Sequence, residues 1–238
     1  MNGVIGLAGV LALLLTAGGL LGVADRERFI PRWLLVAALL VAVNDALLTR
    51  CYGLLPDLVP AATLNWQGKA LALVATLTIA ALPAFGWPRC GLTLVQAPGS
   101  LRGALPVALL YCALFVWLAA IFPNDVASRE DLTFQLTMPG LEEECFYRGL
   151  LLHALDRAFA GRARWLGVDW GWGAVLSSLL FGLAHAFGYG AEGFGFDPLT
   201  MMLTAVPSLV AVWVRLRTGS VLLPIVMHNA GNSLMLLM

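Results

Sequence analysis

The chain has 238 residues, of which 60% are hydrophobic and only 12% are charged, and its mean hydropathy is +0.86. This composition lies outside the range of soluble globular domains and indicates a polytopic membrane protein. The formal net charge is +0 and no basic stretch is interleaved with aromatic residues, which argues against nucleic acid as a partner. The four cysteines show no paired spacing, so the sequence indicates neither a disulfide framework nor a zinc knuckle.

Eight apolar segments follow one another along the chain, and each is expected to form a transmembrane helix. They cover residues 4–23, 33–49, 70–87, 104–122, 132–155, 171–187, 198–214 and 221–238. The predicted fold class is therefore all-α, a polytopic helical membrane bundle of about eight transmembrane helices. Three helices fall in residues 1–103 and five in residues 104–238, and we expect the two groups to form one compact unit. The first three helices are expected to be dispensable to the chemistry.

The basic residues predict the orientation of the bundle. If the N-terminus lies outside, the opposite, non-cytoplasmic loops contain only Arg50, Lys69 and Arg129. The cytoplasmic loops then contain ten basic residues: Arg26, Arg28, Arg32, Arg89, Arg102, Arg157, Arg162, Arg164, Arg215 and Arg217. Basic residues concentrate in the cytoplasmic loops of membrane proteins. We therefore predict an integral, multi-pass protein of the plasma (inner) membrane with both termini on the non-cytoplasmic side.

The fifth segment contains an unusual charged stretch, Leu-Glu-Glu-Glu-Cys-Phe-Tyr-Arg-Gly at positions 141–149. A charged side chain at the bilayer centre costs roughly 2.5–3.5 kcal/mol, so such a cluster usually has a function. The helix is expected to start anew or kink at 139–140, where proline precedes glycine. Glu144 and Arg148 are then four residues apart and form an ion pair. Glu143 points about 100° away, has no local partner, and becomes a candidate general base or acid.

A simpler interpretation of this stretch is the start of an interfacial helix, where acidic side chains favour the positive end of the helix dipole. Two later segments contain further polar pairs. Phe181 and His185 share one helical face, as do His228 and Asn232. One histidine in an apolar helix is more often a satisfied packing residue than a catalyst. Two such histidines in separate membrane helices that also carry small residues favour a functional cluster.

Other polar residues are interpreted structurally. His153 lies near a helix end, where a cation suits the dipole, and Asn44 and Asp45 are expected to make hydrogen bonds between helices. The segment 193–197 is expected to be a flexible turn in an outside loop. The chain has no Gly-x-Ser-x-Gly and no His-Glu-x-x-His motif, which argues against serine and site-2-type zinc proteases.

Glu143-Glu144-x-x-x-Arg148, Phe181-x-x-x-His185 and His228-x-x-x-Asn232, taken together, resemble a known family. They are similar to the three motifs of the CPBP (CAAX protease and bacteriocin-processing, or Abi) intramembrane endopeptidases. The resemblance covers residues 104–238. The family includes the type II CAAX prenyl endopeptidases, which remove a C-terminal tripeptide from prenylated proteins. It implies peptide-bond hydrolysis in a membrane-embedded cavity, acting on a membrane-associated or lipidated peptide or protein. This chain has an extra acid, Glu142, and the spacing to the arginine selects Glu143 and Glu144.

The chemistry of amide hydrolysis fits these residues. It requires an activated water, donors for the developing oxyanion and a proton for the leaving amine. Glu143, helped by His185, can take a proton from water, and His228 and the Asn232 amide can donate to the oxyanion. Similarity to the family implies the same allocation of roles.

The charged residues of the site allow a structural role and a rival mechanism. Glu144 and Arg148 are expected to hold the motif helix in register. A rival mechanism uses Glu143, His185 and His228 as ligands of a catalytic zinc ion with an open water position. We favour the metal-free glutamate mechanism, with no cofactor, because the constellation contains no His-x-x-x-His pair and no cysteine.

Two other classes of function use the same residues. A transporter or proton-coupled carrier also needs intramembrane Glu, Arg and His, although the sequence shows no inverted repeat. A non-catalytic scaffold would keep the motifs for packing alone. The sequence does not choose between a prenylated C-terminus, a bacteriocin leader and a membrane-anchored peptide as substrate, and it leaves the oligomeric state open.

Overall fold

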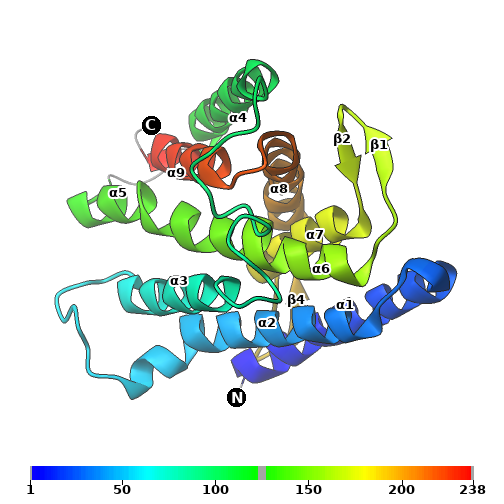
Figure 1. The fold of residues 1–238 in the computed structure, drawn as a ribbon. Helices are drawn as coiled ribbons and strands as arrows, with labels where there is room; N and C mark the ends of the chain where they lie inside the picture. Colours follow the sequence, from blue (N-terminus) through cyan, green and yellow to red (C-terminus); the bar gives the residue numbers. More distant parts are fainter. Residues whose placement is uncertain (1, 123–126, 237–238) are drawn as a thin grey trace.

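The computed structural model describes residues 2–122 and 127–236, and most of this chain is helical (Figure 1). The α-helices are α1 (Asn2–Ala24), α2 (Pro31–Thr49), α3 (Trp66–Ala80), α4 (Leu101–Ile121), α5 (Arg129–Gln135), α6 (Leu152–Ala158), α7 (Trp172–Ala186), α8 (Pro198–Thr218) and α9 (Leu222–Leu236). A π-helix, η3 (Gly140–Leu151), runs directly into α6, and short 3-10 turns lie at η1 (Arg26–Arg28) and η2 (Cys51–Leu54). In Figure 1, α1, α2, α3 and the η3–α6 helix lie roughly alongside one another.

Four helices of the described ranges are long and apolar enough to cross a membrane, namely α1, α2, α4 and α8. They support the prediction of a helical membrane protein, but the predicted count of about eight spans is not confirmed. The predicted span 70–87 ends early, because α3 stops at Ala80 and the chain then turns through Pro83. The predicted spans at 171–187 and 221–238 correspond to α7 and α9, which have 15 residues each within the described chain.

The predicted fifth span is not one helix. The chain forms α5, turns at Leu136 and Thr137, and resumes into η3 at Gly140. The break therefore lies just before the kink predicted at Pro139-Gly140, where the helix has already resumed. What the sequence did not predict is the π winding of residues 140–151. In a π-helix, residue i is hydrogen-bonded to residue i+5 rather than i+4. Such segments are rare in proteins, and those that occur are often found at functional sites.

Two β-hairpins make the all-α prediction wrong in detail. β1 (Ala163–Trp165) pairs with β2 (Val168–Trp170), and β3 (Phe187–Gly190) pairs with β4 (Gly193–Phe196), both antiparallel. The segment 193–197 is consequently a strand and a helix cap rather than a flexible turn. Asp197 caps α8, since its Oδ1 accepts a hydrogen bond from the Leu199 N–H at 2.9 Å.

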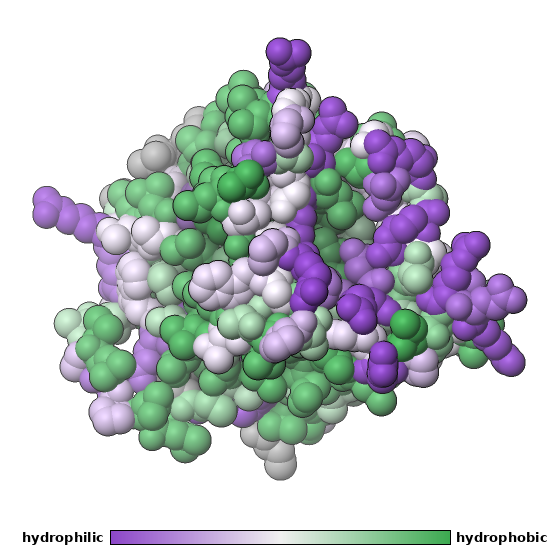
Figure 2. Space-filling model, in the orientation of Figure 1, coloured by the Kyte–Doolittle hydropathy of each residue, from purple (hydrophilic) through white to green (hydrophobic). Residues whose placement is uncertain are grey.

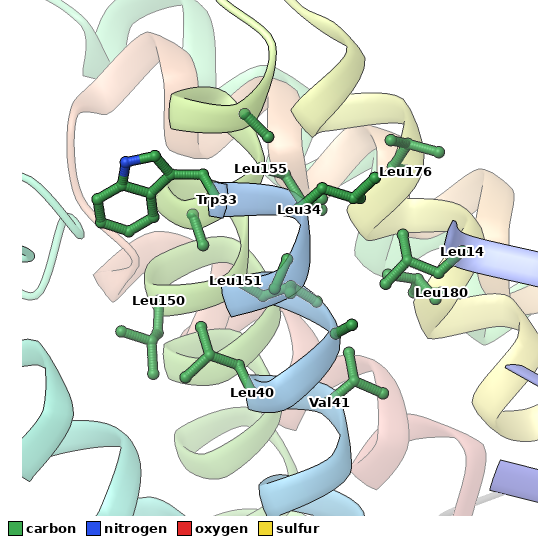
Figure 3. Packing of buried hydrophobic residues seen from close by; sticks show 14 of the residues in the cluster. Leu14, Trp33, Leu34, Leu40, Val41, Leu150, Leu151, Leu155, Leu176 and Leu180 are labelled. Carbon is green, nitrogen blue, oxygen red and sulfur yellow. The ribbon is translucent and has the colours of Figure 1, made fainter. Parts of the chain in front are cut away.

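The main core joins the N-terminal helices to the motif helix (Figure 3). Leu14 of α1 and Leu34 of α2 are buried in one cluster with Leu151 at the end of η3, Leu155 of α6 and Leu180 of α7. Each of these side chains is at most 5% exposed. Removing one such leucine from a close-packed core typically costs 2–5 kcal/mol. The N-terminal helices are thus packed directly against the segment that carries the charged motif.

The surface matches a protein in contact with lipid. Figure 2 shows broad hydrophobic areas across this face, with hydrophilic residues gathered toward the right edge, over the β1–β2 hairpin and the α1–α2 junction. Large exposed apolar side chains lie on helices α1, α2 and α4, among them Leu20, Leu35, Leu39, Leu109 and Leu110. Contiguous apolar surface on this scale is unusual for a soluble monomer.

One carboxylate fastens the linker before α3 to α5. Glu130 accepts hydrogen bonds from the Thr63 N–H and hydroxyl, at 3.0 and 2.9 Å, from the Leu64 N–H and from the Trp66 indole. These bonds, led by that from the Thr63 hydroxyl, hold the pKa of Glu130 below its ordinary value. The carboxylate form therefore favours the folded state above the ordinary pKa, and this contribution is lost as the pH falls through the lowered pKa.

We expect Glu130→Gln to loosen this linker, because an amide oxygen cannot accept the same set of donors as a carboxylate. Limited proteolysis of residues 51–65 in detergent should become faster at neutral pH. The difference from the wild type should shrink toward pH 3, where Glu130 itself is protonated. Glu27→Gln, an exposed acid elsewhere, is the matched control. Equal cleavage rates for wild type and Glu130→Gln at pH 7 would contradict this role.

Candidate active site

A cavity of about 410 Å³ is lined by residues of α3, α4, α5, η3, α7, α8 and α9, and Lys69 of α3 is one of them. Five of the six residues predicted for the site line it: Glu143, Arg148, His185, His228 and Asn232. The sixth, Glu144, is 1% exposed and lies behind them. The structure therefore brings together residues from three segments that are far apart in the sequence.

Glu144 links the motif helix to α9. Its Oε2 is 3.1 Å from Nε of Arg148, as the i, i+4 spacing predicts, and its Oε1 is 2.7 Å from Nδ1 of His228. A carboxylate accepts hydrogen bonds only, so the His228 Nδ1–H must be the donor. This arrangement fixes the ring of His228 and leaves its Nε2 to face Glu143.

Glu143 has a partner that the sequence did not predict. Its Oε1 is 2.5 Å from Nζ of Lys69 on α3, a partner 74 positions away, so the expected absence of a local partner did not reveal it. Its Oε2 is 3.7 Å from Nε2 of His228, beyond hydrogen-bond distance, and is a buried acceptor with no hydrogen bond from the described residues. Buried polar atoms are usually paired. This oxygen is therefore an unsatisfied acceptor in the cavity lining.

The extra acid, Glu142, completes a second set of contacts. It is fully buried, its Oε2 is 2.8 Å from Nζ of Lys69, and its Oε1 accepts from the Asn44 amide at 3.0 Å. The prediction that Asn44 bonds between helices is thus confirmed. The same prediction for Asp45 is wrong, because Asp45 instead pairs at 2.5 Å with Arg50, just beyond the end of its own helix.

Local sequence explains why Lys69 reaches the site. Asn65 is the N-cap of α3, with its Oδ1 accepting from the Gly68 N–H at 2.9 Å. The Asn65 amide also donates to the Leu48 carbonyl at 2.7 Å, which ties the start of α3 to α2. Lys69 consequently lies in the second turn of a fixed helix rather than in the outside loop in which we expected it.

His185 is held by its own helix. Its Nδ1 is 2.9 Å from the Phe181 carbonyl, which can only accept, so Nδ1 carries the proton and the neutral ring keeps Nε2 as an acceptor. The Phe181 ring lies between the charged groups, with the Arg148 guanidinium carbon 4.3 Å from its centroid and the His228 ring edge-on at 6.0 Å. The FxxxH spacing therefore positions a cation–π platform and an imidazole at one wall of the cavity.

Two asparagines of α9 behave differently. Asn232, predicted to donate to an oxyanion, donates to Oε1 of Gln135 at 2.8 Å. Asn229, which the sequence did not single out, accepts from the Gly140 N–H at 2.7 Å and donates to the Thr137 carbonyl at 3.1 Å. Asn229 thereby bonds the unpaired backbone at the start of η3. A side chain at Gly140 would overlap Asn229 and the Ile225 carbonyl, so glycine is required for this close approach.

The zinc alternative requires Glu143, His185 and His228 to converge. Within the described part of the chain, no group of three His, Cys, Asp or Glu side chains is placed to hold a metal ion. The Lys69 ammonium also lies against Glu143, where a second cation would be repelled. These donors do not fit a zinc site as they stand, and we derive no step through a metal.

Three residues of the site escaped the sequence analysis: Lys69, Asn229 and Gln135. A signal existed for Lys69, because it is the only lysine of the 238 residues and it directly precedes an apolar segment. Asn229 is adjacent to a predicted residue. Gln135 offers no pattern that distinguishes it from a surface residue, since its contact with Asn232 joins positions 97 residues apart.

Comparison with known families agrees with this geometry. Residues 131–234 match the family described as Type II CAAX prenyl endopeptidase Rce1-like, and that range contains all six predicted site residues. Lys69 and Asn44 lie outside the matched range. Neither the curated proteins nor the solved structures gave a match to the chain.

Proposed function

We infer that this chain, which over residues 131–234 belongs to the Rce1-like type II CAAX prenyl endopeptidase family, is an intramembrane endopeptidase. It hydrolyses a peptide bond of a membrane-associated or lipidated peptide or protein. The observation that carries the inference is the free Oε2 of Glu143, a buried acceptor in a cavity shared with two imidazoles. A protease of this type needs one acceptor for the proton of a water molecule, and the cavity offers it.

The residues can perform the reaction as follows. A water next to Oε2 of Glu143 attacks the carbonyl carbon of the scissile bond while its proton passes to that oxygen. The Nε2 acceptor of His185 orients the same water. The negative charge that develops on the carbonyl oxygen is stabilised by donors from α9, the Asn232 amide and the His228 ring. Because Nδ1–H of His228 is bonded to Glu144, this role requires a proton on Nε2 as well. Glu143 then returns the proton to the leaving nitrogen, so that the C–N bond breaks and the enzyme is restored.

The basic partners of the carboxylates support a glutamate mechanism. Arg148 compensates the charge of Glu144, and Glu144 in turn holds His228 in the orientation that faces Glu143. Lys69 compensates the charge of Glu143 itself. Because each carboxylate already has a basic partner, the site is preorganised for charge stabilisation without a cofactor.

We also propose that the protein lies in the plasma (inner) membrane with both termini on the non-cytoplasmic side. The ten arginines of the expected cytoplasmic loops support this orientation. With Lys69 placed in α3, the opposite side retains only Arg50 and Arg129 of the basic residues counted there, which strengthens the asymmetry.

The test is a proteomic comparison of membranes that contain the wild type or Glu143→Ala. At least one membrane-associated peptide or protein should accumulate in its unprocessed form with the variant. Glu192→Ala, an exposed acid in the β3–β4 turn, is the matched control and should process normally. A variant that changes solute or proton flux while all processing continues would instead identify a carrier.

A further inference from the structure

We propose that Lys69 is a positioning residue of the endopeptidase site, which holds Oε1 of Glu143 and thereby presents Oε2 to the water. The proposal rests on the proposed function of the cavity. It also assigns a role to Glu142, the acid beyond the family motif. Glu142 is held by Asn44 through one oxygen and holds Lys69 through the other. The site then extends over α2 and α3, which lie outside the matched range.

The contacts argue that Lys69 serves Glu143 and not only Glu142. Nζ lies 2.5 Å from Oε1 of Glu143 and 2.8 Å from Oε2 of Glu142, so the shorter contact goes to the residue that lines the cavity. The other oxygen of Glu142 is occupied by Asn44 at 3.0 Å. Glu142 is therefore fixed from α2, and it fixes the ammonium from a second direction.

The choice of lysine supports the same conclusion. The chain has one lysine, whereas its other 13 basic side chains, excluding histidine, are arginines. An ammonium is a compact charge whose three donors can turn toward two oxygens of adjacent residues, whereas a guanidinium is a planar fork suited to one carboxylate. Lys69 also lies near the start of α3, where the helix dipole disfavours a cation. Its position is therefore explained by the two carboxylates and not by its helix.

The site combines three carboxylates with two basic side chains. Three carboxylates, Glu142, Glu143 and Glu144, face two fixed cations, Lys69 and Arg148. The Glu142–Lys69 pair adds no net charge to the family motif, yet it places an ammonium against Glu143. The His228 ring faces two of these carboxylates, with Nδ1 2.7 Å from Glu144 and Nε2 3.7 Å from Glu143.

The consequence for the reaction is a choice between the two oxygens of Glu143. Oε1 accepts from Lys69 throughout, so the proton of the attacking water can go only to Oε2. Without the ammonium the carboxylate would be free to rotate, and productive alignment would be lost. Misplacement of a reacting group by about 1 Å can cost roughly 10²-fold in rate.

The first experiment needs no substrate. Lysine labelled with ¹⁵N gives one side-chain Nζ resonance, because the chain has one lysine. In detergent micelles this resonance should shift with Glu143→Gln and with Glu142→Gln, and should stay unchanged with Glu192→Gln. An Nζ resonance that does not respond to Glu143→Gln overturns the contact and the proposal with it.

The second experiment uses the peptide that accumulates with Glu143→Ala. We expect Lys69→Met to lower kcat by about 10²-fold with KM changed less than about twofold, and Lys69→Arg to restore only part of kcat. Arg50→Met, which breaks a comparable pair outside the cavity, should leave both constants unchanged. If Lys69→Met fails to fold, the double variant Lys69→Met/Glu142→Leu removes the neutral pair as a unit.

The outcomes separate the two proposals. Wild-type kcat in Lys69→Met, or in the double variant, overturns the positioning role while the protease remains. If no peptide accumulates with Glu143→Ala, the proposed function fails and the role of Lys69 fails with it, even where the Nζ shift confirms the ion pair. Partial rescue by arginine together with an unchanged KM supports the role, because loss of packing alone would not respond to the charge.

Discussion

His228→Gln is expected to lower kcat by about 10²- to 10⁴-fold, the range typical of a lost acid–base or oxyanion group. The imidazole faces two carboxylates, with Nδ1 at 2.7 Å from Glu144 and Nε2 at 3.7 Å from Glu143. Glutamine fills a similar volume and can keep the bond to Glu144, but it lacks the second ring nitrogen that faces Glu143. The measurement is the processing rate of the peptide that accumulates with Glu143→Ala.

A second histidine provides the control for this variant. His153 lies in α6, outside the cavity lining, between the rings of Trp33 and Phe85 at 6.2 and 6.0 Å. His153→Gln should therefore process the peptide at a rate close to that of the wild type. If His228→Gln retained more than about a tenth of wild-type turnover, His228 would have no direct part in the chemistry.

Arg148→Met is expected to give the largest loss of stability, roughly 3–5 kcal/mol in the free energy of unfolding. Arg148 is 2% exposed and its partner Glu144 is 1% exposed, so the substitution leaves a carboxylate buried without its cation. The methionine also loses the contact of the guanidinium with the Phe181 ring. Reversible unfolding in mixed micelles measures the difference.

The matched control for this prediction is Arg164→Met. Arg164 pairs with Asp169 at 3.0 Å in the β1–β2 hairpin, but both side chains are at least 60% exposed. Exposed ion pairs are worth about 0–1 kcal/mol. A similar loss for both variants would mean that burial does not decide the strength of these pairs. The apolar double variant Glu144→Leu/Arg148→Met should recover part of the stability lost with Arg148→Met, since it leaves no unpaired charge.

The local part of the site was predictable from the sequence. The i, i+4 spacing correctly placed Arg148 against Glu144, and the proline and glycine at 139–140 predicted a break in the helix that lies just before them. The sequence predicted that His185 and His228 share a site because each belongs to a polar motif in a separate membrane helix. Both line one cavity, although the sequence predicted no contact between them. Resemblance to a family supplied what helical periodicity alone could not.

The rest of the site depends on contacts between distant residues. Lys69 and Glu143 are 74 positions apart, and no period of 3.6 residues relates them. The hairpin at 187–196 is a different case, because its alternation of aromatic residues and glycine is typical of a strand and was interpreted as a loop. The strongly apolar segments on either side, 171–187 and 198–214, predict helices, and the short stretch between them was therefore assigned to the loop that joins them.

The shortness of α3 and α7 has a consequence for the surrounding lipid. Each has 15 residues, and a helix of that length spans about 22 Å, whereas the hydrocarbon layer is about 30 Å thick. A membrane adapts to short helices by thinning around them. We therefore expect the bilayer to be locally thinner beside the motif residues, which would bring the aqueous phase close to them. The rate of the reaction at this site should then be highest in membranes of short-chain lipids.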